Sequence, residues 1–175
     1  MLSGFQYRAA LAATKITVNE LGALIGLHPI TLLRYKKTPN QIPVSRRVKN
    51  TLLLQDFFER RSVLFPATNS VKLKTDFTSK NITRFHLVVA RIATGLNQHQ
   101  LSSILRISPS TLSILENLNN MEVINTRTLK NSNLIRFFEH VGITLNDDYS
   151  VSINKDPEKF IEKAKMLVDT KRKDI

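Results

Sequence analysis

The sequence predicts a mainly α-helical protein in which two similar units, each followed by a small β-hairpin, precede a C-terminal helix. Three observations predict this class. The chain repeats itself at an interval of 80 residues, apolar residues in both copies recur with helical spacing, and short stretches of alternating polarity follow the helical segments. Hydrophobic residues make up 42% of the chain and charged residues 23%, which is typical of a protein with a packed core.

The repeat aligns the two halves of the chain without a gap. The block Phe57-Phe58-Glu59 matches Phe137-Phe138-Glu139, and Thr31-Leu32 matches Thr111-Leu112. Similar apolar residues occupy equivalent positions between these identities. Chance gives scattered identities rather than a block with matching apolar positions, so we predict that one module was duplicated.

Helical spacing predicts three helices at the start of each copy. In the first copy we expect a helix over residues 4–14, a second helix capped by Thr17 and a third opened by His28-Pro29. In the second copy Gly95 ends the first helix, Asn97 caps the second, and Ser108-Pro109 opens the third. The residues expected to face inward from the second and third helices are Leu21, Leu24, Ile25, Leu32 and Tyr35 in copy one, and Leu101, Ile104, Leu105, Leu112 and Leu115 in copy two.

A further helix in each copy ends in the Phe-Phe-Glu block, whose aromatic side chains we expect in the core. Alternating stretches separated by turn formers then predict the two hairpins. The predicted organisation is a first domain over 1–75, a linker over 76–82, a second domain over 83–155 and an amphipathic C-terminal helix over 156–175. That last helix either packs on its own domain or pairs with a second chain.

The charge of the chain points to an acidic partner. The net charge is +12, and residues 1–80 carry most of it, with 13 Lys/Arg against 4 Asp/Glu. An excess of this size opposes compaction, so it favours a protein that meets nucleic acid or an anionic surface. Cysteine is absent, no apolar run is long enough to span a bilayer, and the N-terminal residues lack the pattern of a signal peptide. We therefore expect a cytoplasmic protein with no membrane partner.

The second and third helices of each copy resemble a known family. Residues 17–32 and 97–112 are similar to the phage-repressor (Xre-type) helix-turn-helix family, in which a small residue follows a Leu in helix two and a Ser or Thr opens the recognition helix. Gly22 and Ser102 occupy the small position, and Gly26 supplies the turn. The resemblance implies tandem lambda-repressor-like helix-turn-helix domains, whose recognition helices enter the major groove of DNA.

The resemblance also implies which residues contact DNA. The base readers it implies in copy one are His28, Ile30, Thr31, Leu33 and Arg34, and those in copy two are Ser108, Ser110, Thr111, Ser113 and Ile114. Gln98 matches a family Gln that contacts the DNA backbone, and Thr17 opens the same helix in copy one. The phosphate contacts it implies are Lys36, Lys37, Arg46, Arg47 and Lys49.

The two copies depart from the family pattern in opposite ways. Copy one has Val18 where the family prefers Gln and Lys36 where it often has Glu. Copy two keeps Gln98 and Glu116 but has Arg106 in place of the turn glycine, and it has few basic residues. Two alternatives therefore stay open: both copies read DNA, or copy two holds a partner or a second subunit.

These features predict a sequence-specific, double-stranded DNA-binding transcription regulator, associated with the nucleoid. The family resemblance alone implies a source in a phage or another mobile element. The alternative is a protein-binding module, an antiactivator or co-regulator, that uses the same surface to hold another regulator. Further candidate partners are a homodimer and RNA polymerase. A monomer would cover two unlike half-sites, and a homodimer a longer palindrome.

The sequence carries no pattern for catalysis or for a metal or cofactor site. A glycine-rich phosphate loop, paired carboxylates and a nucleophile elbow are all missing, so we expect no enzyme activity. The four histidines lack metal-ligand spacing. We expect His28 and His99 near the DNA and His86 and His140 on helix surfaces.

Overall fold

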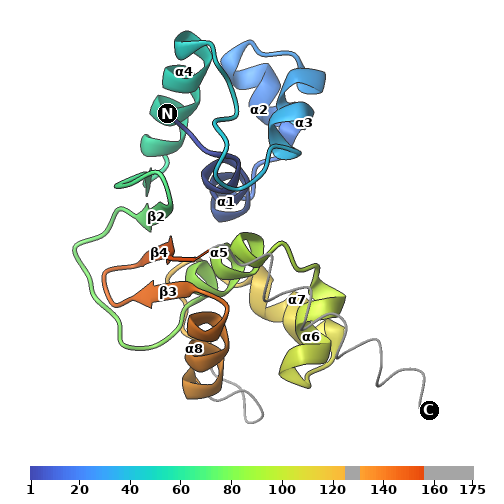
Figure 1. The fold of residues 1–175 in the computed structure, drawn as a ribbon, viewed down its shortest axis with the longest axis vertical. Coiled ribbons are helices and arrows are strands. Elements are labelled where there is room, and N and C mark those ends of the chain that lie inside the picture. The colour runs from blue at the N-terminus through green and yellow to red at the C-terminus, as the bar shows by residue number, and fades with distance from the viewer. Residues whose placement is uncertain (125–130, 156–175) are drawn as a thin grey trace.

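The computed structural model describes residues 1–124 and 131–155, which form eight helices and one four-stranded antiparallel sheet (Figure 1). The first half contains α1 (Gly4–Thr14), α2 (Val18–Ile25), α3 (Pro29–Lys36), α4 (Val48–Glu59), β1 (Val63–Leu64) and β2 (Ser70–Leu73). The second half contains α5 (Arg84–Thr94), α6 (Gln98–Leu105), α7 (Pro109–Asn117), α8 (Asn131–His140), β3 (Ile143–Asn146) and β4 (Ser150–Ile153). The predicted C-terminal helix over 156–175 lies outside the described residues, and the predicted domain boundaries stay a prediction.

The helices begin and end at the residues that local chemistry favours. The Thr17 hydroxyl accepts a hydrogen bond from the backbone N–H of Glu20 (3.2 Å), and the Asn97 side chain accepts one from Gln100 (2.8 Å). Both caps are closed by the residue three positions on, which forms a capping box. Gly26 and Gly95 end α2 and α5 in the left-handed conformation that glycine adopts without steric cost. The predicted caps are therefore confirmed.

The two predicted hairpins form a single sheet rather than separate wings. The strand order is β1-β2-β4-β3, and β2 pairs with β4 across the boundary between the two halves. In this pairing Val71 lies opposite Val151, its own equivalent in the repeat, while Ser70 lies opposite Ser152. Equivalent strands therefore exchange equivalent contacts, which is the pattern of a two-fold axis passing between them.

Helices α1 and α5 continue this symmetric contact. They pack against each other on one side of the sheet, and their buried residues belong to one continuous core. The Asn40 amide donates a hydrogen bond to the carbonyl of Ala93 (2.9 Å), and Asn120 donates to the carbonyl of Ala13 (2.9 Å). Because Asn120 and Ala93 are equivalent to Asn40 and Ala13, each half holds the other in the same way.

Most predicted inward residues are buried, but two predictions were wrong. Leu24 is 60% exposed, because α2 meets the core along the stripe formed by Val18, Leu21, Gly22 and Ile25, and Leu24 lies beside it. His86, expected on a helix surface, is only 2% exposed. The sheet that the two hairpins form covers the N-terminal turn of α5, where His86 stacks on Tyr149 (ring centroids 5.5 Å apart).

The core of copy one contains a tyrosine that copy two lacks. Tyr7 is fully buried and packs edge-on against Tyr35 and Phe58, with ring centroids 6.1 and 6.3 Å away. Its hydroxyl has no hydrogen-bond partner among the described residues. Burial, and secondarily Tyr35, raises the pKa of this phenol well above its usual range. Leu87 fills the equivalent place in copy two.

We expect Tyr7→Phe to leave the free energy of unfolding unchanged or to raise it by up to about 1 kcal/mol, because a buried unpaired hydroxyl carries a desolvation cost. Chemical denaturation of both proteins measures this. Phe57→Ala serves as a positive control that should lower stability by about 3 kcal/mol. A loss of 2 kcal/mol or more in Tyr7→Phe would show that the hydroxyl is hydrogen-bonded.

The neutral imidazole of His86 stabilises the start of α5. Its Nδ1 accepts a hydrogen bond from the backbone N–H of Thr83 (3.2 Å), and its Nε2 faces the carbonyl oxygen of Asn146 at 3.0 Å. Gln6 does the same work in copy one, accepting from Ser3 and donating to the carbonyl of Ser70 (3.0 Å). Burial lowers the pKa of His86, an effect that outweighs the raising effects of the Asn146 carbonyl, Asp147 and Asp148.

Stability should therefore fall as the solution becomes acidic. Below the ordinary histidine pKa of about 6.5, the unfolded chain takes up a proton that the folded chain resists, so unfolding is favoured as pH falls toward the lowered pKa. We expect His86→Gln, which copies Gln6, to reduce the decrease in Tm between pH 7.5 and 5.5. The exposed His99→Gln is the matched control and should keep the full decrease. An equal decrease in Tm in the unchanged protein, in His86→Gln and in His99→Gln would contradict this role of His86.

Candidate nucleic-acid interface

Helices α2 and α3 meet closely across a tight turn. A Cβ atom on Gly22 would lie 2.7 Å from the carbonyl oxygen of Leu27, so only glycine fits there without a shift. The Leu27 N–H donates to the carbonyl of Gly22 (3.2 Å), and Gly26 turns the chain with φ of 69°. In copy two Ser102 takes the place of Gly22, and Arg106 adopts the left-handed conformation with φ of 55°. The left-handed conformation is less favourable by about 1 kcal/mol for a residue that has a Cβ atom.

The side of α3 that faces the protein is held by two buried residues. Leu32 is fully buried, and Tyr35 is anchored through its hydroxyl, which accepts a hydrogen bond from Asn50 (3.1 Å). The opposite side of α3 faces outward, with Ile30 56% and Leu33 47% exposed and Arg34 beside them. His28 caps this helix, its Nδ1 accepting from the backbone N–H of Ile30 (3.2 Å).

Helix α7 presents a similarly placed but neutral surface. Leu112 and Leu115 are buried, whereas Ile114 is 65% exposed. The Ser108 hydroxyl caps the helix by accepting from the Thr111 N–H (3.0 Å), and it also lies 2.8 Å from the hydroxyl of Ser110. The outer face of α7 therefore offers hydroxyl groups and one apolar side chain.

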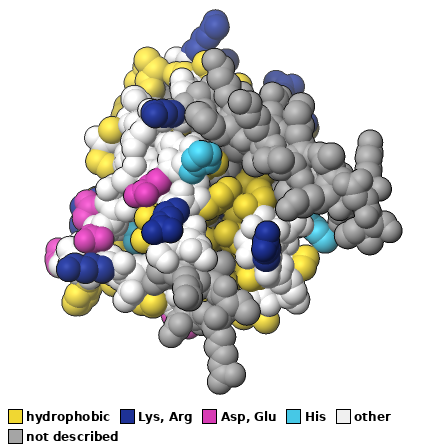
Figure 2. Space-filling model, turned by 60° about the horizontal axis from the view of Figure 1, so that its bottom comes forward, with side chains coloured by type: hydrophobic (Ala, Val, Ile, Leu, Met, Phe, Trp, Pro, Cys, Tyr) yellow, Lys and Arg dark blue, Asp and Glu magenta, His cyan; other side chains and the backbone are white. Residues whose placement is uncertain are grey.

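Six cationic side chains lie on α3, on the segment that follows it and at the start of α4. All six are exposed, and none forms an ion pair with another described residue; they are Arg34, Lys36, Lys37, Arg46, Arg47 and Lys49. The described residues differ on the face at the other end of the molecule, where α6 and α8 lie. There Figure 2 shows their cationic side chains set singly among acidic and hydrophobic ones.

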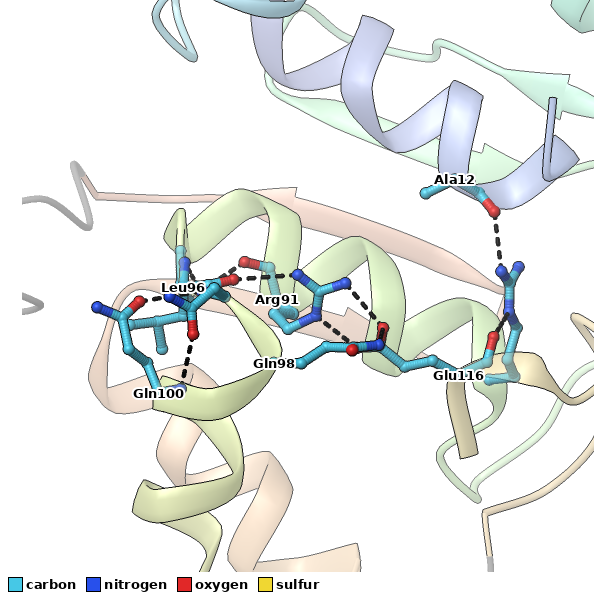
Figure 3. A network of polar contacts seen from close by, with 9 residues as sticks. Ala12, Arg91, Leu96, Gln98, Gln100 and Glu116 are labelled. Carbon is cyan, nitrogen blue, oxygen red and sulfur yellow. Dashed lines mark hydrogen bonds and ion pairs between the residues drawn. The ribbon is translucent and has the colours of Figure 1, made fainter. Parts of the chain in front are cut away.

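Copy two holds a buried polar network where copy one has none (Figure 3). The Glu116 carboxylate accepts hydrogen bonds from both Nε and Nη2 of Arg91 and from the amide of Gln98 (2.7 Å). Arg91 also donates to the carbonyl of Leu96 (3.1 Å). Gln98, for which the resemblance implies a DNA contact, thus uses its amide donor to fix α6 to the end of α7.

All three members of this network are replaced in copy one. Leu11, Val18 and Lys36 stand at the positions of Arg91, Gln98 and Glu116. Leu11 is buried and Val18 half-buried, so apolar contact takes the place of the polar one. The Lys36 side chain forms no ion pair with a described residue and lies exposed at the end of α3.

Two arginines that sequence reasoning missed fix the ends of α3 and α7. Arg8 donates to the carbonyl of Lys36 (3.1 Å), and Arg84 donates to the carbonyl of Glu116 (2.9 Å). Arg84 also crosses to copy one, where it reaches the carbonyl of Ala12 (2.9 Å). The two arginines hold equivalent carbonyls from non-equivalent positions of α1 and α5, so the repeat alignment gave no signal for them.

The remaining residues for which the resemblance implies DNA contacts lie on α3, on α7 and at the cap of α2. Thr17 caps α2 and is exposed, while Thr31 and Ser113 are partly buried on the outer halves of α3 and α7.

Within the described residues no group of three or more His, Asp or Glu side chains is placed to hold a metal ion, and no helix is long and apolar enough to cross a bilayer.

A comparison with protein-family models, with curated proteins and with solved structures found no match. The interpretation of this surface therefore depends on the residues of the chain itself.

We expect Glu116→Lys to lower the free energy of unfolding by about 3 kcal/mol, because it leaves Arg91 part-buried beside a second cation. Adding Arg91→Leu should recover a large part of this loss, since copy one carries that leucine and lysine together. Chemical denaturation of the single and double variants measures the coupling. The exposed Lys36→Glu is the control and should change stability by less than about 0.5 kcal/mol. Additive losses in the double variant would argue against the network.

Proposed function

We propose that this protein is a sequence-specific, double-stranded DNA-binding transcription regulator of the helix-turn-helix type. One observation carries the proposal: the outer face of α3 is exposed, and the six unpaired cations of the site lie on and beside it. Such a protein works on chromosomal DNA, which places it in the cytoplasm with the nucleoid.

The dimensions of α3 suit a duplex. An α-helix with its side chains is about 10–12 Å across, and the major groove of B-DNA is about 12 Å wide. Because Leu32 and Tyr35 bury the inner side of α3, its outer side enters the groove first. Arg34 then suits guanine, which offers two acceptors, while Ile30 and Leu33 suit the methyl groups of thymine.

The cations beside α3 suit the phosphates that flank the groove. Arg46, Arg47 and Lys49 surround the start of α4, and Lys36 and Lys37 lie at the end of α3. A charge excess gathered around one exposed helix raises the local concentration of a polyanion and positions it without specifying sequence.

One observation favours the alternative function, a module that holds another regulator. An apolar groove lined by Met1, Ile42, Pro43, Val48 and Leu52 lies beside Arg46, and most of these side chains are exposed. Exposed apolar clusters often mark protein contacts. A protein partner captured without any enrichment of DNA would favour this function.

Selection of bound duplexes from a random DNA pool tests the proposal directly. Enrichment of one duplex sequence is the expected result, and the absence of any enriched sequence would overturn the proposal.

Binding should also weaken steeply with salt. If about six phosphates are neutralised, log Kobs falls against log salt with a slope near −5. We expect Arg46→Ala with Arg47→Ala to flatten that slope by about 2, because each lost cation releases about one counterion fewer.

Arg60→Ala with Lys74→Ala is the matched control for this measurement. It removes two exposed cations near β1 and β2, on the far side of α1 from α3, and should leave the slope unchanged. An equal effect of both pairs would point to general charge attraction instead of contacts beside α3.

A further inference from the structure

We propose that one chain binds a non-palindromic duplex site made of two unlike half-sites, with copy one on one half-site and copy two on the other. This inference rests on the proposed function. It adds the symmetry of the target and the number of chains that occupy it.

The two copies are held in one fixed relation by reciprocal contacts. The Leu73 N–H donates to the carbonyl of Tyr149 (3.0 Å), and the Ile153 N–H donates to the carbonyl of Asn69 (2.9 Å). These bonds exchange equivalent positions of the repeat, as do those of Asn40 and Asn120. This isologous contact within one chain positions the two copies relative to each other, as dimerisation positions two subunits.

This relation places both candidate readers on the same side of the molecule. In Figure 1 the sheet lies on one side of α1 and α5, and α3 and α7 lie on the other. Dimeric helix-turn-helix proteins use such an arrangement to reach two half-sites about 34 Å apart, one turn of the duplex. Here a single chain already contains both readers.

The surface between the readers is cationic. Two adjoining hollows lie between α3 and α5, lined among others by Arg8, Lys15, Lys36 and Lys37, which form no ion pair with a described residue, and by Arg91, which is paired with Glu116; neither lining includes an acidic side chain. Lys15 ties copy one to the end of α7 by donating to the carbonyl of Asn117 (2.9 Å). Hollows of this charge suit the backbone of the duplex between the half-sites.

The two reading faces differ at almost every equivalent position. His28, Ile30, Leu33 and Arg34 of copy one correspond to Ser108, Ser110, Ser113 and Ile114 of copy two, and only Thr31 and Thr111 are the same. Since a guanidinium, a hydroxyl and a methyl group prefer different base edges, the two half-sites must differ. A palindrome would mismatch one of the two faces.

The two copies also contribute unequal numbers of contacts to the DNA backbone. Lys36 and Lys37 end the reading helix of copy one, whereas copy two has Glu116, engaged by Arg91 and Gln98, and the neutral Asn117. Copy one therefore supplies most phosphate contacts, and copy two adds selectivity through neutral groups. The complex has one orientation on its site.

The test uses the full chain and a pool of duplexes randomised over about three turns. The enriched duplex should be non-palindromic and should bind one chain, as counted by native mass spectrometry. Two palindromes, each made by doubling one half-site, should bind at least tenfold more weakly. Inserting half a turn, about 5 base pairs, between the half-sites should also cost at least tenfold.

Variants assign each half-site to its copy. Arg34→Ala should relax base preference in one half-site alone, and Ser110→Ala with Ser113→Ala in the other alone. An enriched palindrome that binds two chains, a tolerated insertion, or variants that alter the same half-site would overturn the inference while leaving DNA binding intact. A pool with no enriched duplex would overturn the proposed function as well.

Discussion

Antiparallel pairing of β2 with β4 sets the relation between the two halves of this chain, and most other features depend on it. Val71 and Val151 lie opposite each other at the centre of the pairing, so the helices on either side are related by the same rotation. The contact of α1 with α5 and the reciprocal amides of Asn40 and Asn120 complete one shared core. Neither pair of strands would be stable alone, because an isolated hairpin is at best marginally stable in water.

Within this symmetric frame, the copies differ at single positions and also in one group of interacting residues. Arg91, Gln98 and Glu116 act together, and copy one replaces all three with Leu11, Val18 and Lys36. Such concerted change is expected, since removing one partner of a buried ion pair leaves the other uncompensated. A substitution in a true homodimer appears in both subunits, whereas here it alters one copy alone. The arrangement therefore permits a stable polar network in one half and an exposed cation in the other.

The sequence predicted the helices and their ends well, because caps, first-turn prolines and turn glycines act locally; Thr17, Asn97 and Gly26 behave as expected. It did not predict that the hairpins join, since β2 and β4 have only four residues each and no local pattern shows which distant strand will pair with them. The burial of His86 follows from that sheet and was missed with it. The outer faces of α3 and α7 were inferred from a resemblance, whereas Arg8 and Arg84 bind carbonyl oxygens that no sequence pattern reveals.

The covalent joining of the two copies also bears on how the protein responds to its own abundance. A dimeric regulator dissociates into subunits when dilute, so the amount of its assembled form falls with the square of the total. In this chain the partner half is always present at a high effective concentration, set by the connection between the copies. Occupancy of its target would then rise in simple proportion to the number of molecules, even when a cell holds only a few.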